Sequence, residues 1–257
     1  MMPARTTALL AVLALPACSL PRVEWSPQRY ERQVQAPPTR QPDASSRLRV
    51  AAAAEASGQS DIALSMYGAA AAATPADAAV QARFAGALAR SGSALRAEEV
   101  LTAALARRPG DGVLLGQLGW LRLRGGAADE AMQLFHRALS AAPADASALD
   151  GRGVALDMAG RHGDAQESYR RALAVSPGLV AASNNLGMSL LLSGRAADAV
   201  AVLEPLASRP DAPARVRNNL AVAQAAAGDR NRARTILSQR EGADDLDGLV
   251  SALRPPG

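Results

Sequence analysis

The sequence predicts an all-α protein built from about six stacked helix–turn–helix units, and three residue types at a fixed interval predict it. Glycine recurs every 34 residues, at Gly58, Gly92, Gly126, Gly160, Gly194 and Gly228. Alanine keeps the same interval, at Ala63, Ala97, Ala131, Ala165, Ala199 and Ala233. Proline does so at Pro75, Pro109, Pro143 and Pro177. A fixed period with such residues in register indicates helix pairs stacked in a row, each unit contacting its neighbours.

Each unit is predicted to consist of a helix A, a glycine turn, a helix B and a proline turn. Counted from Ala44, the units start at residues 44, 78, 112, 146, 180 and 214. The glycine stands where helix A must end, because glycine adopts left-handed backbone angles at the least cost. The alanine lets helix B approach helix A closely. The proline ends helix B because it has no backbone N–H to donate.

Residues between these markers predict caps and core. Three aspartates follow a proline by two residues and are predicted to cap the next helix A: Asp77, Asp111 and Asp145. Helix B offers one large residue in register: Tyr67, Leu101, Phe135, Tyr169, Leu203 and Leu237. Helix A offers a small one: Ala85, Gly119, Gly153, Gly187 and Ala221. Arg122 and Arg152 stand at positions where the repeat predicts leucine.

The 34-residue period with this punctuation is typical of tetratricopeptide (TPR) repeats. The predicted fold is therefore a TPR α-solenoid over residues 44–240, followed by a short capping helix and tail at 241–257. Leu246, Leu249, Val250 and Leu253 form one face of that final helix, which would cover the last repeat.

TPR folds bind other proteins along the concave surface lined by their A helices. The side chains of helix A that packing does not use are therefore predicted to face a protein ligand. These candidate groove residues are Arg83, Arg90, Gln117, Trp120, Arg124, Asp150, Val154, Asp157, Asn184, Asn185, Met188, Asn218 and Asn219.

Two features of this set favour a binding role. The triplets Asn184-Asn185-Leu186 and Asn218-Asn219-Leu220 are identical and lie one repeat apart. Their paired amides can donate to and accept from the backbone of an extended peptide, or they are solvated asparagines of the repeat consensus. Trp120 is either an interface anchor or an extra packing residue between repeats.

Composition argues against catalysis and against nucleic-acid binding. Hydrophobic residues make up 49% of the chain but aromatics only 3%, which suits close-packed helices. The net charge is +4 and every basic residue is arginine, so no P-loop or Schiff-base lysine exists. The arginines are spread along the chain rather than clustered. His136 and His162 lack further ligands at metal-binding spacing, so we expect no enzyme, metal, cofactor or small-molecule substrate.

The first residues predict export and lipidation. A positive start and a short apolar run form a signal peptide over residues 1–17. The sequence Leu15-Pro16-Ala17-Cys18 resembles a bacterial lipobox, which implies acylation of Cys18, the chain's one cysteine. An ordinary signal with an incidental cysteine is the alternative. Residues 18–43 are rich in proline and predict a flexible tether. By resemblance, Ser19 after the cysteine implies the outer membrane, with the repeats facing the periplasm.

Residues 44–240 and the lipobox resemble the TadD-like TPR lipoproteins of the Tad (tight adherence, Flp pilus) system, most of all over residues 149–206. The resemblance rests on the following segments: Gly153-Val154-Ala155-Leu156-Asp157, Gly160-Arg161-His162, Asn184-Asn185-Leu186-Gly187-Met188-Ser189-Leu190 and Leu203-Glu204-Pro205-Leu206-Ala207, completed by Asn218-Asn219-Leu220-Ala221. It implies a non-enzymatic scaffold that helps the pilus secretion machinery to assemble or localise. The implied partner is the outer-membrane secretin or another Tad component. The alternative is a general periplasmic adaptor for cell-envelope enzymes or outer-membrane assembly.

Overall fold

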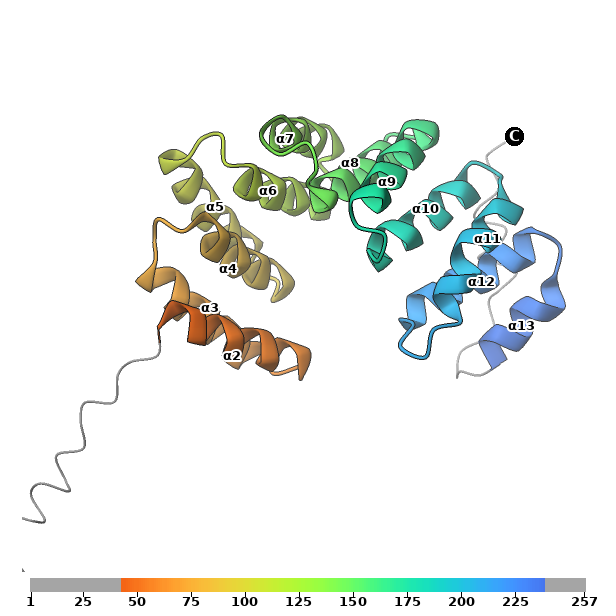
Figure 1. Ribbon diagram of the computed structural model, residues 1–257, viewed down its shortest axis with the longest axis horizontal. Coiled ribbons are helices and arrows are strands. Elements are labelled where there is room, and N and C mark those ends of the chain that lie inside the picture. The colour runs from red at the N-terminus through yellow and green to blue at the C-terminus, as the bar shows by residue number, and fades with distance from the viewer. Residues whose placement is uncertain (1–42, 239–257) are drawn as a thin grey trace, which may run out of the picture. The chain divides into compact units, whose positions relative to one another are not determined.

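A computed structural model describes residues 43–238, which form twelve helices and no strand (Figure 1). The A helices are α2 (Ala44–Ala56), α4 (Ala78–Arg90), α6 (Gly112–Arg124), α8 (Ala146–Met158), α10 (Val180–Leu192) and α12 (Ala214–Ala226). The B helices are α3 (Ser60–Ala73), α5 (Ala94–Arg107), α7 (Ala128–Ala141), α9 (His162–Val175), α11 (Ala196–Ala207) and α13 (Arg230–Ser238).

This architecture confirms the predicted fold class. Each A helix begins at the residue where the 34-residue count starts a unit. The predicted signal peptide, Cys18, the tether and the C-terminal capping helix lie outside the described residues.

The turns also form as the repeat predicts. All six periodic glycines have positive φ, from +73° to +102°, and each lies just after an A helix. The four periodic prolines each follow a B helix by two residues. Helix α11 departs from this pattern, because it contains Pro205, ends at Ala207 and is followed by Pro210.

Aspartate side chains cap four of the A helices: Asp43 caps α2, and the three predicted aspartates cap α4, α6 and α8. The Oδ1 atoms of Asp77, Asp111 and Asp145 each accept hydrogen bonds from two backbone N–H groups of the first turn. For Asp145 the donors are Ser147 and Ala148, at 2.9 and 3.1 Å. These bonds satisfy N–H groups that have no partner within the helix.

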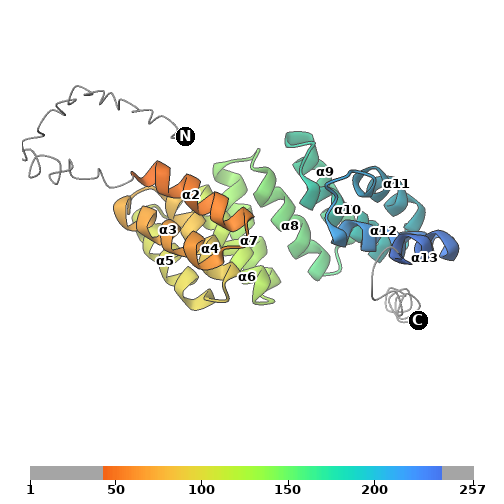
Figure 2. The same ribbon diagram turned by 90° about the horizontal axis from the view of Figure 1, so that it is seen from below.

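The helices pack in chain order, and neighbouring pairs lie side by side in both views (Figures 1 and 2). Contacts between alternate helices run through the A helices: α4 with α6, α6 with α8, α8 with α10 and α10 with α12. No two described B helices make a comparably extensive contact. The A helices therefore form the more tightly packed layer of the stack.

Close packing within the stack depends on glycines that receive large side chains. The ring of Phe135 on α7 lies between Gly119 of α6 and Gly151 of α8. A Cβ atom added at Gly151 would stand 2.2 Å from Cζ of that ring, and one at Gly119 would stand 2.9 Å from it. Tyr169 and Leu203 fill the same place against Gly153 and Gly187. The six periodic alanines are buried, at 3% exposure or less, which confirms the predicted contact.

The two arginines at leucine positions have polar partners. Arg122 donates to Glu98 at 2.6 Å and is paired with Glu130 at 2.8 Å. The Nε of Arg152 donates to the hydroxyl of buried Ser168 at 2.8 Å. The guanidinium of Arg122 therefore binds to α5 and α7, and that of Arg152 binds to α9. The repeat pattern did not predict these bonds to B helices.

We predict that Gly151→Ala lowers the free energy of unfolding by about 1–3 kcal/mol, because its methyl group overlaps the Phe135 ring held between two helices. Urea unfolding followed by circular dichroism measures this.

Gly116→Ala is the matched control, since Gly116 is also in an A helix but no atom lies within 4 Å of an added Cβ. It should stabilise by about 0.5–1 kcal/mol through helix propensity. Equal effects of the two substitutions would contradict the proposed overlap.

Candidate protein-binding site

The predicted groove residues come from α4, α6, α8, α10 and α12, the helices of the tightly packed layer. The structure brings four of them together around one pocket between α4 and α6, lined by Arg90, Gln117, Trp120 and Arg124. Its volume is about 110 Å³. Gly86 belongs to the same lining, and a Cβ atom there would stand 3.3 Å from the Arg90 guanidinium and 3.4 Å from the Gln117 amide oxygen.

Trp120 fulfils the packing interpretation and also borders the pocket. Its ring meets Phe135 edge to face, with centroids 5.7 Å apart and planes at 76°. Its Nε1 donates to the Ser147 hydroxyl on α8 at 3.2 Å, which fixes the ring between two A helices. The tryptophan is thus a rigid wall of the pocket, held by the core behind it.

The pocket is cationic. Arg90 forms an ion pair with Glu55 on α2 at 2.5 Å, and both side chains are partly exposed. Arg124 is exposed and has no ion pair among residues 43–238. Arg83, a further candidate on α4, is exposed but does not line this pocket. The unpaired Arg124 guanidinium offers donors for a carboxylate.

Side chains of the asparagine pairs form hydrogen bonds between neighbouring A helices. The Asn185 amide donates to Asp150 Oδ1 at 3.0 Å, which links α10 to α8. The Asn219 amide donates to Asn184 Oδ1 at 2.8 Å, which links α12 to α10. Asp150 and Asn184 are buried, at 3% and 7% exposure. The prediction that these two side chains face a ligand is therefore corrected, because they join adjacent A helices.

Asp150 is an unusually placed carboxylate. Burial raises its pKa to about 6, against the hydrogen bond from Asn185 and the charge of Arg215, which both favour the ionised form. A buried carboxylate is costly to ionise, so this position is less stable at neutral pH than in weak acid.

Asp157 also proves to be a structural residue. Its Oδ1 accepts from the Ser189 hydroxyl at 2.7 Å and lies 2.8 Å from His162 Nδ1. Its Oδ2 accepts from the Tyr169 hydroxyl at 2.9 Å. Burial and the Asp157 charge raise the Tyr169 pKa, so the phenol stays protonated and donates. One carboxylate thereby joins α8, α9 and α10.

The first repeat contains the same pair, because the Tyr67 hydroxyl donates to Glu55 at 3.1 Å. Glu55 and Asp157 occupy equivalent repeat positions, as do Tyr67 and Tyr169. The repeats that carry Leu or Phe in place of the tyrosine carry Leu or Ala in place of the acid. This covariation between the two positions, repeat by repeat, is the signal in the sequence that indicates the network, which the 34-residue pattern alone did not predict.

The remaining candidates are all partly buried. Val154 and Met188 are partly buried and pack against the core beneath them. Asn218 is also partly buried.

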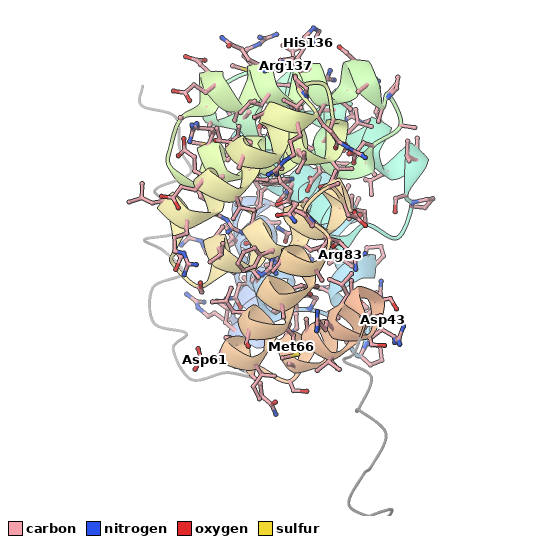
Figure 3. All side chains as sticks on the ribbon, turned by 90° about the vertical axis from the view of Figure 1, so that its left-hand side faces the viewer. Asp43, Asp61, Met66, Arg83, His136 and Arg137 are labelled. Atoms are coloured by element: carbon pink, nitrogen blue, oxygen red, sulfur yellow. The ribbon has the colours of Figure 1, made fainter. Side chains whose placement is uncertain are left out.

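No catalytic arrangement was found among the described side chains. His136 is exposed and projects from α7 beside Arg137 (Figure 3), while His162 bonds to Asp157. Within residues 43–238, no group of three or more His, Cys, Asp and Glu side chains could hold a metal ion. None of the described helices is long and apolar enough to cross a membrane.

Comparison with known proteins agrees with the fold. Tetratricopeptide repeat models match residues 88–151 and 151–213. No curated protein matches the chain significantly. The chain is a TPR-repeat protein, and the fold is one that serves protein–protein interaction.

Three solved structures illustrate the likeness. The Cut9–Hcn1 hetero-tetramer of the APC/C gives a TM-score of 0.70 at 16% identity, covering 83% of this chain but only 43% of that one. PilW gives 0.67 at 20% identity, covering 80% and 98%. PilF of Pseudomonas aeruginosa gives 0.62 at 15% identity, covering 81% and 95%. Because 289 solved chains match, the shared fold alone does not select a function.

We predict that Asp150→Asn stabilises the protein at pH 7. The folded state keeps a proton on Asp150 up to a pH of about 6, whereas the unfolded chain releases it near 3.8. The free energy of unfolding therefore falls as the pH rises through this window, by an amount on the order of 2–3 kcal/mol. Asparagine keeps the acceptor for Asn185 without this cost, so urea unfolding should show a gain at pH 7 that vanishes near pH 4.

Asp61→Asn, at an exposed carboxylate on α3, is the control and should not reproduce that gain. A destabilised Asp150→Asn at pH 7 would show that the ionised carboxylate is favoured where it stands.

We predict that Asp157→Ala lowers the free energy of unfolding by about 2–3 kcal/mol, since it leaves the buried Tyr169 hydroxyl and the Ser189 hydroxyl without this acceptor. Asp164→Ala, which breaks an exposed ion pair with Arg161, should cost under about 1 kcal/mol. Thermal and urea unfolding compare the two, and similar losses would refute a special role for the Asp157 network.

Proposed function

We propose that this protein is a non-enzymatic TPR scaffold lipoprotein that aids assembly or localisation of the Tad/Flp pilus secretion machinery. Its partner in this proposal is the outer-membrane secretin, or another Tad component. Acylated Cys18 would hold it at the outer membrane, with the repeats in the periplasm.

The resemblance of residues 149–206 to TadD-like lipoproteins carries the proposal. The structure adds a reason why these residues matter to the fold. Gly153 receives Tyr169, and Gly187 receives Leu203. Asp157 and Asn185 form hydrogen bonds to residues of other helices. The resembling segments therefore contain the contacts that set how successive A helices pack, and with them the spacing of a binding surface.

A second consideration comes from the fold's relatives. PilW is described as a widely conserved type IV pilus biogenesis factor. The proposal gives this chain a comparable role in a different pilus system, in which a lipid anchor and a rigid repeat stack bring a partner protein to the membrane.

The anchor is open to a direct test. Several acyl chains on one cysteine give stable membrane attachment, whereas a single chain does not. We predict that Cys18→Ala moves the protein from the membrane to the soluble fraction. Heat-resistant secretin multimers in membrane extracts should fall at the same time, as immunoblots of fractionated cells would show.

Ser26→Ala is the matched control, because it changes another residue of the tether and keeps the thiol. Unchanged secretin multimers after Cys18→Ala would argue against the proposal. Normal pili on deletion, together with co-purification of cell-wall hydrolases, would instead identify a general periplasmic adaptor.

A further inference from the structure

The last residue of each A helix occupies the same repeat position. From α2 to α12 these residues are Ala56, Arg90, Arg124, Met158, Leu192 and Ala226, and all of them are exposed. The row is cationic on α4 and α6 and apolar on α8 and α10. Small residues flank it at both ends.

The residue one turn earlier extends the row on the same face of each helix, since residues i and i+4 are neighbours on a helix surface. Trp120 precedes Arg124, Val154 precedes Met158, and Met188 precedes Leu192. On α4 the earlier residue is Gly86, which leaves room beside Arg90. The pocket between α4 and α6 is lined by both positions, so this face is open to a ligand there.

The apolar half is exposed without a local reason. Met158 is 50% exposed and Leu192 is 42% exposed, at equivalent positions on two helices that contact each other. An arginine in the last turn of a helix is favoured by the helix dipole, which explains Arg90 and Arg124 on local grounds. The same reasoning gives no advantage to methionine or leucine, whose side chains lose stabilisation by facing water.

We propose that this face of α4, α6, α8 and α10 binds an extended segment of a partner protein that carries carboxylates at one end and apolar side chains at the other. The carboxylates lie over Arg90 and Arg124, and the apolar side chains cover Met158 and Leu192. This inference rests on the proposed scaffold function and specifies the chemistry of its partner.

Charge complementarity selects the occupant of the cationic half. Arg124 has no ion pair within the described chain, while Glu55 neutralises Arg90 in part. Adjacent packed helices lie about 8–10 Å apart, and an extended chain of the polyproline II type advances about 3.1 Å per residue with three residues per turn, so every third side chain lies on the same side. The partner segment therefore presents its contact residues at about every third position, with two acidic positions next to two apolar ones.

Selection from a random dodecapeptide library displayed on phage tests the proposal, with the purified repeat protein as bait. The enriched peptides should place Asp or Glu about three residues apart at one end and Leu, Met, Val or Phe at the other. Arg124→Glu should weaken the binding of a selected peptide about tenfold and reduce its salt dependence. Met158→Gln and Leu192→Gln should each weaken it by about the same factor while leaving the salt dependence unchanged.

Arg170→Glu and Leu95→Gln are the matched controls, because both residues are exposed on B helices, Leu95 at 80%. They should leave peptide binding unchanged, and circular dichroism verifies that every variant is folded. Failure to enrich any peptide, enrichment of peptides without acidic residues, or equal losses in the controls would overturn the proposal.

The chain's own residues 241–257 also combine acidic and apolar positions, with Asp244, Asp245 and Leu249 among them. A synthetic peptide of this sequence is therefore an arm of the same assay. If it binds the repeats as tightly as the selected peptides and responds to the same variants, the occupant is the C-terminal segment of this chain, from the same or a second copy, and the partner-protein proposal is wrong.

The proposed pilus role and the proposed binding surface can be tested separately. If Arg124→Glu with Met158→Gln abolishes peptide binding but leaves secretin multimers unchanged, the proposed surface stands and the pilus function falls. If peptide selection fails while Cys18→Ala still removes the multimers, the function stands and this surface is rejected.

Discussion

The contact between a large residue of helix B and a glycine of helix A underlies the rest of this structure. Phe135 against Gly119 and Gly151, Tyr169 against Gly153, and Leu203 against Gly187 leave no room for a methyl group. Because the helices meet closely at these points, this side chain of helix B fills the interior together with buried leucines and alanines, and few aromatic residues are needed. The A helices are thereby brought into mutual contact, and their remaining positions form a continuous layer.

Polar bonds then fix how one A helix sits on the next. Asn185 with Asp150 and Asn219 with Asn184 join helices in three successive repeats. Such bonds are directional, so they specify an angle between helices that apolar packing alone would leave looser. Asp150 shows the cost, because burial makes its ionised form unfavourable. These bonds therefore hold the geometry of the proposed binding surface at some cost in stability.

The exposed positions of each A helix are available to a partner protein. The outward positions change from arginine on α4 and α6 to methionine and leucine on α8 and α10, although the backbone repeats regularly beneath them. Recognition can therefore vary along the stack without disturbing it. Trp120 serves both the core and the exposed surface, since its ring packs on Phe135 and also bounds the pocket beside Arg124.

The sequence by itself determined the helices, the first residues of the A helices, the glycine turns and three of the aspartate caps. Each of these depends on backbone preferences of residues close together in the chain, and the 34-residue period repeats them six times. It also predicted that Arg90, Gln117, Trp120 and Arg124 share a surface, because equivalent positions of stacked repeats must be neighbours.

Only the tertiary structure decided which polar side chains form hydrogen bonds between helices and are therefore not free to bind a partner. Asn184, Asp150 and Asp157 are polar residues that the sequence alone does not distinguish from ligand-facing ones, and their bonds join groups from 12 to 35 residues apart. Whether such a group meets a partner or water depends on the angle and spacing of adjacent helices, which no local preference encodes.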